Sequence, residues 1–247
     1  MNCLIYIFAF MLLSCVGSFI GLCSYRIQRG EQIWGGRSHC DKCGKKLRTF
    51  ELIPIISFFL LGGKCSGCKM RISMESTVIE IVSALLGTSC LLMYGVTLRG
   101  FAYCIVTCIL IEIAVLDFKT MEISDIAVAL IGVIGIVLMI QSGEYISSLI
   151  GLICVSGPFL IMSLCKVMGM GDVKLMAAVG LLLGYKGVLI VAFFGIVIGC
   201  VAAIFMKVLN RKDWKSEIAF GPFLCAGTFL SMMFGRQLLS MYLTLLQ

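Results

Sequence analysis

The sequence predicts an all-α polytopic membrane protein with about eight transmembrane helices and one sizeable loop outside the membrane, directly after the first helix. Hydrophobic residues make up 60% of the chain and charged residues only 13%, against roughly 45–50% and about 25% in soluble domains. The apolar residues gather in runs near the length of about 20 residues that a helix needs to cross a bilayer. Lys and Arg gather between these runs. This composition is typical of a membrane protein.

The first apolar run, 3–23, predicts a retained span with its N-terminus outside, because Arg26 and Arg29 follow it and no basic residue precedes it. The segment 24–73 holds half of all Lys and Arg, which places it in the cytoplasm by the positive-inside rule. The run 173–185 is short and glycine-rich, so it suits a tilted, broken or re-entrant helix. The further predicted spans are 76–95, 100–116, 125–141, 145–165, 173–185, 187–207 and 218–240.

With these eight spans alternating in direction, all Lys and Arg residues except Arg99, Lys186 and Arg236 fall on the cytoplasmic side. The net charge of +7 therefore reflects membrane topology. No basic stripe interleaved with aromatic residues is present in the sequence, so we expect no nucleic-acid partner. We predict three parts, which are a first transmembrane helix (1–23), a cytoplasmic metal-binding loop (24–73) and a transmembrane bundle (74–247).

Four of the 14 cysteines form two Cys-x-x-Cys pairs in the hydrophilic loop, Cys40 with Cys43 and Cys65 with Cys68. Two such pairs supply four thiolates, the ligand set of a closed, structural zinc site. Two disulfides or free thiols are the alternatives, but disulfides rarely persist in the cytoplasm. His39 precedes Cys40 and is a possible substitute ligand, although a complete set of four cysteines favours a bystander. The other cysteines lie in or at the ends of apolar runs, where cysteine acts as a small hydrophobe.

Two aspartates occupy the ends of apolar runs that face the same side. Asp117 ends a run predicted to pass from outside to inside, and Asp172 precedes a run predicted to return. Ionisable groups beside a membrane span are candidates for a functional site, and two carboxylates that share one proton are able to hydrolyse a peptide bond. Gly169 and Gly171 would let a substrate strand approach the backbone beside Asp172. For Asp172 alone, the alternative role is an N-terminal helix cap.

Five short motifs together resemble the type IV prepilin peptidase family, and they extend over most of the chain. The Gly-x-Gly-Asp element by itself is weak, because presenilin-like proteases share it. The five motifs are Gly17-Ser18-Phe19 with Tyr25-Arg26, Gly36-Arg37-Ser38 before Cys40, Leu52 to Ser57, Asp117 eight residues before Asp125, and Gly169 to Lys174.

The resemblance implies a multi-pass protein of the bacterial plasma membrane that cleaves the basic leader of type IV prepilins and pseudopilins after a glycine, on the cytoplasmic side. It also implies methylation of the new N-terminus with S-adenosylmethionine as methyl donor, an activity associated with the N-terminal part of the family. Asp117 and Asp172 correspond to the catalytic pair, and Cys40, Cys43, Cys65 and Cys68 to the zinc ligands. Arg26 and Glu80 are candidate contacts of the methyl donor.

The chain departs from the family pattern at Ser124, where the family usually has proline. A proline would stiffen the turn after Asp117, so we expect a looser turn here. Three other functions remain open at this point. They are a peptidase without methyltransferase activity, a presenilin-like protease with both aspartates deep in the bilayer, and a transporter or assembly scaffold that uses the aspartates as a cation site.

Overall fold

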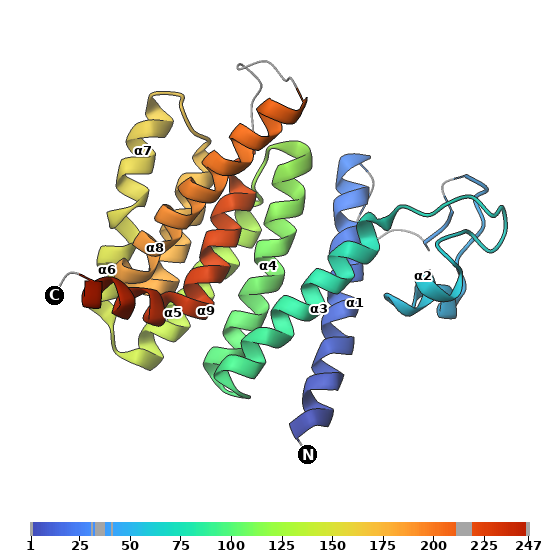
Figure 1. The fold of residues 1–247 in the computed structure, drawn as a ribbon, viewed down its shortest axis with the longest axis horizontal. Helices are drawn as coiled ribbons and strands as arrows, with labels where there is room; N and C mark the ends of the chain where they lie inside the picture. The colour runs from blue at the N-terminus through green and yellow to red at the C-terminus, as the bar shows by residue number, and fades with distance from the viewer. Residues whose placement is uncertain (1, 31, 33–37, 41, 211–218, 246–247) are drawn as a thin grey trace. The chain divides into compact units, whose positions relative to one another are not determined.

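The computed structural model describes residues 2–30, 32, 38–40, 42–210 and 219–245. Over these residues the chain is helical, and its only β-type pairings are two isolated bridges in the loop, His39 with Lys46 and Lys64 with Arg71. The all-α prediction is therefore confirmed. The chain divides into two compact units, Met1–Glu112 and Ile113–Gln247 (Figure 1).

Unit 1 contains a pair of packed helices, α1 (Asn2–Gln28) and α3 (Met74–Tyr94), with the loop between them in sequence. The loop carries a short 3-10 helix, η1 (Thr49–Leu52), and the short helix α2 (Ile56–Leu60). Helix α1 continues five residues beyond the predicted end of the first span, so Arg26 lies in its last turn and not in the loop.

Small residues allow α1 and α3 to approach closely. A Cβ atom on Gly17 would lie 2.8 Å from the Cα of Glu80 and 2.9 Å from the Cβ of Ser83. Such contacts are closer than side chains tolerate, so the helix pair requires a residue without a side chain at this position.

Helix α4 (Leu98–Thr120) begins in unit 1 and ends in unit 2, where it carries Asp117. Unit 2 continues with α5 (Asp125–Ser142), α6 (Tyr145–Cys154), α7 (Ser156–Leu164), α8 (Met170–Asn210) and α9 (Gly221–Leu245). Helix α8 packs against α5, α6, α7 and α9, which makes it the central element of unit 2.

The predicted span 145–165 is in fact two helices, α6 and α7, which meet at Val155. Pro158 explains the interruption. It has no N–H to donate to the carbonyl of Cys154, and its ring would clash with that carbonyl in a continuous helix. Ser156 partly compensates, because its hydroxyl donates to the carbonyl oxygen of Leu152.

The predicted spans 173–185 and 187–207 lie together in α8, which is interrupted at Gly184 with φ 71° and ψ 179°. Only glycine adopts this backbone conformation readily. A side chain at Gly184 would also meet the hydroxyl of Ser147 on α6. The broken helix expected from the glycine content is therefore present. The break at Gly184 lies one residue before the end of the predicted span 173–185.

Six stretches of the described residues are long and apolar enough to cross a membrane: Cys3–Gln28, Met74–Tyr94, Leu98–Thr120, Asp125–Ser142, Tyr145–Leu164 and Met170–Phe205. The prediction of a multi-pass membrane protein is confirmed at this level. The number eight stays a prediction, because α8 counts once despite its interruption and α9 is not among the six.

Candidate functional site

The first candidate site is the pair Asp117 and Asp172 in unit 2. Asp117 lies near the end of α4 and Asp172 in the first turn of α8, and both side chains are buried, with 6% and 7% of their surface exposed. The charge of Asp117 acts on the carboxyl of Asp172, and both charges act on the nearby thiol of Cys225 in α9. The two aspartates predicted from opposite span directions thus lie in one neighbourhood.

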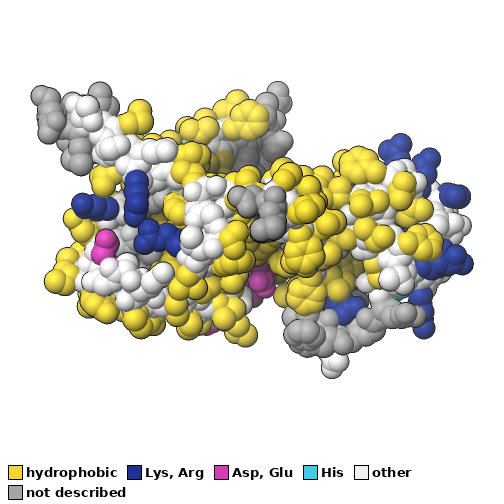
Figure 2. Space-filling view, turned by 90° about the horizontal axis from the view of Figure 1, so that it is seen from below, with side chains coloured by type: hydrophobic (Ala, Val, Ile, Leu, Met, Phe, Trp, Pro, Cys, Tyr) yellow, Lys and Arg dark blue, Asp and Glu magenta, His cyan; other side chains and the backbone are white. Residues whose placement is uncertain are grey.

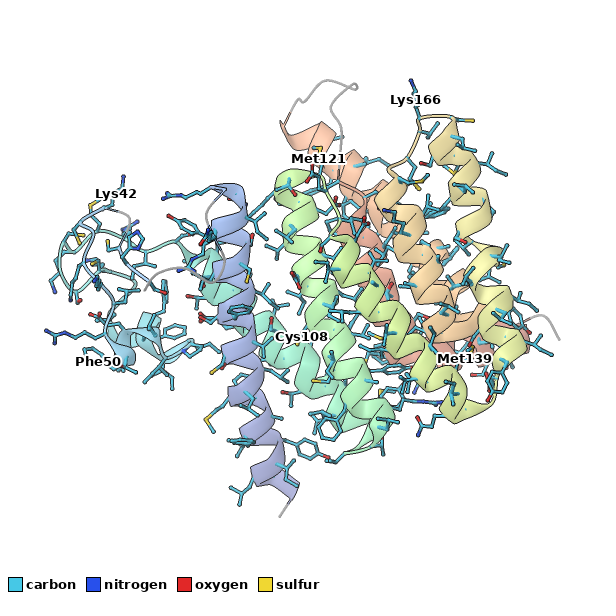
Figure 3. The ribbon with its side chains drawn as sticks, turned by 180° about the vertical axis from the view of Figure 1, so that it is seen from behind. Lys42, Phe50, Cys108, Met121, Met139 and Lys166 are labelled. Carbon is cyan, nitrogen blue, oxygen red and sulfur yellow. The ribbon has the colours of Figure 1, made fainter. Side chains whose placement is uncertain are left out.

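The position of the pair along the helices is visible in Figure 3. Met121, which follows α4, and Lys166, which precedes α8, lie at one end of unit 2, whereas Met139 near the end of α5 lies at the other. Asp117 is four residues before Met121, and Asp172 is six residues after Lys166. The predicted placement of both acids at the same end of the bundle agrees with this arrangement.

Helix α9 contributes a third group to the pair. The backbone N–H of Gly221, the first residue of α9, donates a hydrogen bond of 2.9 Å to Oδ2 of Asp117. A Cβ atom on Gly221 would lie 2.6 Å from the same oxygen. The absence of a side chain is therefore what allows the first turn of α9, with its positive dipole end, to reach the carboxylate.

The Gly-x-Gly-Asp segment has two distinct uses for its glycines. The backbone N–H of Gly169 donates to the Asp172 carboxylate. A Cβ atom on Gly171 would lie 2.9 Å from the Cβ of Ile123 in the connection between α4 and α5. Gly171 thus lets the start of α8 pack directly on the segment that follows Asp117. Asp172 is not the N-terminal cap of α8, because it lies inside the first turn.

The turn after Asp117 is fixed by Ser124 and Lys174. Ser124 is the N-cap of α5, and its hydroxyl accepts from the backbone N–H of Ala127 at 3.4 Å. Asp125 forms an exposed ion pair with Lys174 of α8, with 2.7 Å between Nζ and Oδ1. The expectation of a looser turn rested on the loss of proline, and the hydroxyl cap supplies a different constraint at this position.

The second candidate site is the set of four loop cysteines in unit 1. The sulfur atoms of these residues all lie within 4.8 Å of one another; the residues are Cys40, Cys43, Cys65 and Cys68. The sulfur atoms of Cys40 and Cys68 are 3.8 Å apart, far beyond a disulfide bond. In a tetrahedral zinc site with Zn–S bonds of about 2.3 Å, neighbouring sulfurs lie about 3.8 Å apart. The arrangement therefore fits a tetrahedral metal ion, with all four cysteines as free thiols.

Both cysteine pairs have the same backbone geometry. Gly44 and Lys69, which directly follow the pairs, have positive φ values of 67° and 59°. Their N–H groups donate to the carbonyl oxygens of Cys40 and Cys65, at 2.8 Å and 3.0 Å. The two isolated bridges close the two turns, and His39 takes part in the first bridge. These matching turns direct two sulfur atoms each toward one point, with His39 outside the four-sulfur cluster.

Protonation of the thiols also fits a cation at this point. The backbone N–H groups of Cys68 and Gly67 hold the pKa of Cys65 at about 6. The backbone N–H of Met70 lowers the pKa of Cys68, but burial and the other three thiols outweigh it and raise that pKa to about 11. Neighbouring thiolates repel one another, so the cluster retains protons that a bound dication would displace.

A buried carboxylate connects the two cysteine turns. Glu51 of η1 accepts from the backbone N–H of Arg48 at 2.7 Å, from the hydroxyl of Ser66 and from Nζ of Lys45 at 3.2 Å. These donors, led by the Arg48 N–H, lower the pKa of Glu51 to about 2. Lys45 follows the first turn and Ser66 lies inside the second, so Glu51 fixes the two turns relative to one another.

Glu80, predicted as a contact of the methyl donor, has protein partners on both of its oxygens. Its carboxylate accepts from the backbone N–H of Ile55 in the loop at 2.8 Å and from the hydroxyl of Ser76 at 3.5 Å. The side chain is buried, and Gly17 packs against its backbone. The structure thus brings Glu80 and the Gly17 motif together and gives Glu80 a role in holding the loop.

Arg26, the other predicted contact, is buried in the last turn of α1, with Nη1 at 3.5 Å from the carbonyl oxygen of Gln32. Arg26 and Glu112 both lie near Cys23, so the two side chains share one neighbourhood in unit 1. Gly36 and Arg37 of the sequence motif lie outside the described residues.

Comparison with known proteins agrees with this geometry. The family model for the bacterial peptidase A24 N-terminal domain matches residues 11–94, and the model for the type IV leader peptidase family matches residues 104–204. The chain belongs to the type IV leader peptidase family. Both candidate sites lie within the matched residues, except that the α9 contact to Asp117 lies beyond them.

Individual proteins of the family are similar to this chain over most of its length. A prepilin leader peptidase/N-methyltransferase of Bacillus subtilis is 29% identical over 246 residues, which are 97% of each chain. A protein of the same name from Neisseria gonorrhoeae is 33% identical over 199 residues, 75% of this chain and 66% of that one. One from Pseudomonas aeruginosa is 26% identical over 83% of this chain and 74% of its own length. No solved structure matches the chain.

The sequence did not indicate two sets of supporting residues, one beside Asp117 and one beside the cysteine cluster. Gly221 was hidden within a predicted span, although Gly221-Pro222 is a signal for a helix start. Glu51 and Ser66 looked like ordinary loop residues, because nothing in their spacing indicates that they meet.

Proposed function

We propose that this chain is a membrane aspartic endopeptidase that cleaves the basic leader of type IV prepilins and pseudopilins after glycine, on the cytoplasmic side of the bacterial plasma membrane. Asp117 and Asp172 form its catalytic pair in this proposal. The observation that carries it is the burial of both carboxylates in one neighbourhood of unit 2, in a chain of the leader peptidase family.

In the proposed reaction the two carboxylates share one proton, because like charges in a site of low polarity resist double ionisation. The ionised carboxylate takes a proton from water, whose oxygen attacks the scissile carbonyl carbon. The protonated carboxyl donates its proton to the carbonyl oxygen. Collapse of the intermediate breaks the C–N bond: the leaving amine takes up the proton that the first carboxylate received, and one hydroxyl of the intermediate returns its proton to the second carboxylate, which restores the shared proton of the pair. We treat the two acids as one titrating unit, without assigning the roles individually.

Backbone groups position the two acids for this chemistry. The N–H of Gly221 holds one oxygen of Asp117, and the N–H of Gly169 holds the Asp172 carboxylate. Each carboxylate keeps further lone pairs for water or substrate. A pilin-like substrate would place its apolar helix in the lipid beside the bundle and its basic leader in the cytoplasm, with the scissile bond at the membrane surface.

We further propose that the chain then N-methylates the new N-terminus, as the names of its relatives suggest. S-adenosylmethionine would supply a methyl group that the free amine accepts with loss of a proton. Unit 1 offers a polar group for such a ligand near Arg26, because the hydroxyl oxygen of Ser24 is buried without a hydrogen-bond partner among the described residues. Arg26 and Glu80 remain our candidate contacts, with Arg26 suited to the carboxylate of the donor.

In the same proposal Cys40, Cys43, Cys65 and Cys68 hold a structural zinc ion. A site closed by four thiolates has no open position for catalysis, so the ion would order the loop and take no part in hydrolysis. Glu51 and Lys45 would fix the ligand turns around it.

The proteolytic proposal is tested with Asp117→Asn and Asp172→Asn in membranes supplied with a prepilin. Each variant should cleave about 10²–10⁴-fold more slowly, because each removes a group that moves a proton in the reaction. Glu144→Gln is the matched control, since Glu144 is an exposed acid of unit 2 whose side chain makes no cap hydrogen bond to α6. Normal maturation by either of the first two variants would refute the catalytic pair.

A mass spectrum of the mature product tests the second activity independently. With S-adenosylmethionine present, we expect one added methyl group on the new N-terminus. Cleaved but unmethylated product would leave a peptidase alone.

A further inference from the structure

The loop of unit 1 carries a continuous apolar surface that no described part of unit 1 covers. Its side chains come from η1, α2 and the residues between them, and all are well exposed. They are Phe50 (55% exposed), Leu52 (46%), Ile53 (44%), Ile56 (54%), Phe59 (67%) and Leu60 (81%). Six large apolar side chains within 11 residues are too many to be explained by the scattered apolar residues of ordinary surfaces.

A hydrogen bond to Glu80 of the candidate span α3 ties this apolar surface to the first turns of that helix. The backbone N–H of Ile55, in the middle of the segment, donates to Oε2 of Glu80 at 2.8 Å. Glu80 lies six residues into α3, a candidate span that begins at Met74. With a rise of 1.5 Å per residue, the Cα of Glu80 is about 9 Å in from the start of that helix, and the Glu80 side chain holds Ile55 within one side-chain length of this level. If α3 enters the membrane near Met74, this level lies in the zone of about 5–10 Å in which interfacial helices bury their apolar faces.

The backbone at Ile55 supports a fixed placement. Ile55 has φ 62° and ψ −57°, a conformation that a β-branched residue rarely adopts. Such a conformation persists only where surrounding contacts hold it. The bond to Glu80 is one such contact, so the segment is attached to α3 at a defined point.

Basic residues surround the apolar surface. Figure 2 shows the loop of unit 1 from below, at the right of the picture. Hydrophobic side chains face the viewer there, and Lys and Arg side chains lie around the edge of this hydrophobic area. The basic residues of the loop with described, exposed side chains include Lys42, Lys46, Arg48, Lys64 and Arg71. An apolar centre with a basic margin matches a bilayer surface that contains anionic lipid headgroups.

Lys42 and Phe50 lie at opposite ends of the loop in Figure 3, with Phe50 beside α2. The loop therefore has one polar end, which carries the first cysteine turn, and one apolar end. We propose that the apolar segment from Phe50 to Leu60 inserts into the membrane interface and holds the four-cysteine cluster at the bilayer surface. This inference rests on unit 1 alone and does not depend on the proposed catalytic activity.

The test uses tryptophan as a depth probe in the full chain, reconstituted in vesicles of phosphatidylcholine with phosphatidylglycerol. The two native tryptophans, Trp34 and Trp214, are first replaced by Phe. Phe50→Trp and Phe59→Trp each add one probe on the apolar segment by an aromatic exchange at an exposed position, which preserves the fold. Lys42→Trp places a matched probe on the polar end of the same loop.

Brominated lipid should quench the fluorescence of the Phe50→Trp and Phe59→Trp variants several-fold more strongly than that of the Lys42→Trp variant. Aqueous acrylamide should quench the first two variants several-fold less than the third. Two outcomes would overturn the proposal. Strong quenching of the Phe50→Trp and Phe59→Trp variants by acrylamide, with none by brominated lipid, would place the segment in water. Protection of both variants from both quenchers would mean that protein covers the segment, either unit 2 or another chain.

Discussion

Gly221→Ala provides a direct test of how the aspartate pair is positioned. The added methyl group would lie 2.6 Å from Oδ2 of Asp117 and 3.0 Å from its Cγ. Ordinary van der Waals contact begins near 3.4 Å, so the carboxylate must retreat by about 0.8 Å if the helix does not move. The hydrogen bond of 2.9 Å from the Gly221 N–H would be lost or bent by the same movement.

The strength of the lost hydrogen bond and the displacement of the carboxylate lead independently to the same expected loss of cleavage rate. A hydrogen bond to a charged group contributes about 1.5–3 kcal/mol, which corresponds to about 10- to 100-fold in rate if the bond is needed in the transition state. A misplacement of about 1 Å in a catalytic group costs about 100-fold. We therefore expect prepilin cleavage by Gly221→Ala to be about 10- to 100-fold slower, mainly in kcat, because the change acts on the catalytic pair itself.

The assay is single-turnover cleavage of a purified prepilin by enzyme in lipid vesicles, with thermal unfolding measured in parallel. Gly132→Ala on α5 is the matched control, since the nearest atom to its added methyl group would be the Cβ of Ala178 at 4.0 Å. If Gly221→Ala cleaves as fast as Gly132→Ala, the N–H of Gly221 does not position Asp117. A large loss of thermal stability in Gly221→Ala alone would also contradict the argument, since the change would then act on the fold.

Two further predictions concern the metal cluster and the interruption of α8. Cys65→Ser should reduce bound zinc from one ion per chain toward none and expose the loop to proteolysis. Metal analysis and limited digestion measure these two effects. The control Cys165→Ser, which removes an exposed cysteine of unit 2, should still bind one zinc ion per chain. Gly184→Ala should lower the free energy of unfolding by more than about 1 kcal/mol relative to Gly132→Ala, because Gly184 has φ 71° and a side chain there would meet Ser147. Equal thermal stability of the two variants would show that the backbone at Gly184 relaxes without strain.

The helices were predictable because bilayer thickness and positive-inside charge leave few arrangements for so apolar a chain. Predicted spans 76–95 and 125–141 differ from α3 and α5 by at most two residues at either end. The interruptions were harder to predict. Pro158 divides one apolar run at a position that the sequence analysis did not single out. A break was expected near Gly184 from the glycine content, but its contact with Ser147 of α6 is a tertiary feature that the sequence does not show. Hydropathy averages over such single residues.

The two sites were predictable to different degrees for the same physical reason. Cys-x-x-Cys spacing is local, so it identified all four members of the cluster in advance. The aspartates are 55 residues apart in the sequence, and only the alternation of span direction placed them on one side. Their supporting groups come from still more distant elements. Gly221 meets Asp117 across 104 residues, and no local pattern encodes that contact.

Glu80 was predicted to contact the methyl donor, and in the structure its carboxylate also holds the loop against α3. Its place in α3 and its burial agree with a functional residue, and sequence reasoning assigned it to the methyl donor. The structure gives its oxygens to Ile55 and Ser76, so removing the carboxylate would first release the loop from α3. Loss of methylation in a Glu80 variant would then have two explanations. Glu80→Gln separates them, because an amide oxygen still accepts from the Ile55 N–H, whereas it no longer offers a negative charge to the sulfonium of the donor. Retained methylation in Glu80→Gln, together with its loss in Glu80→Ala, would assign Glu80 to the loop and not to the methyl donor.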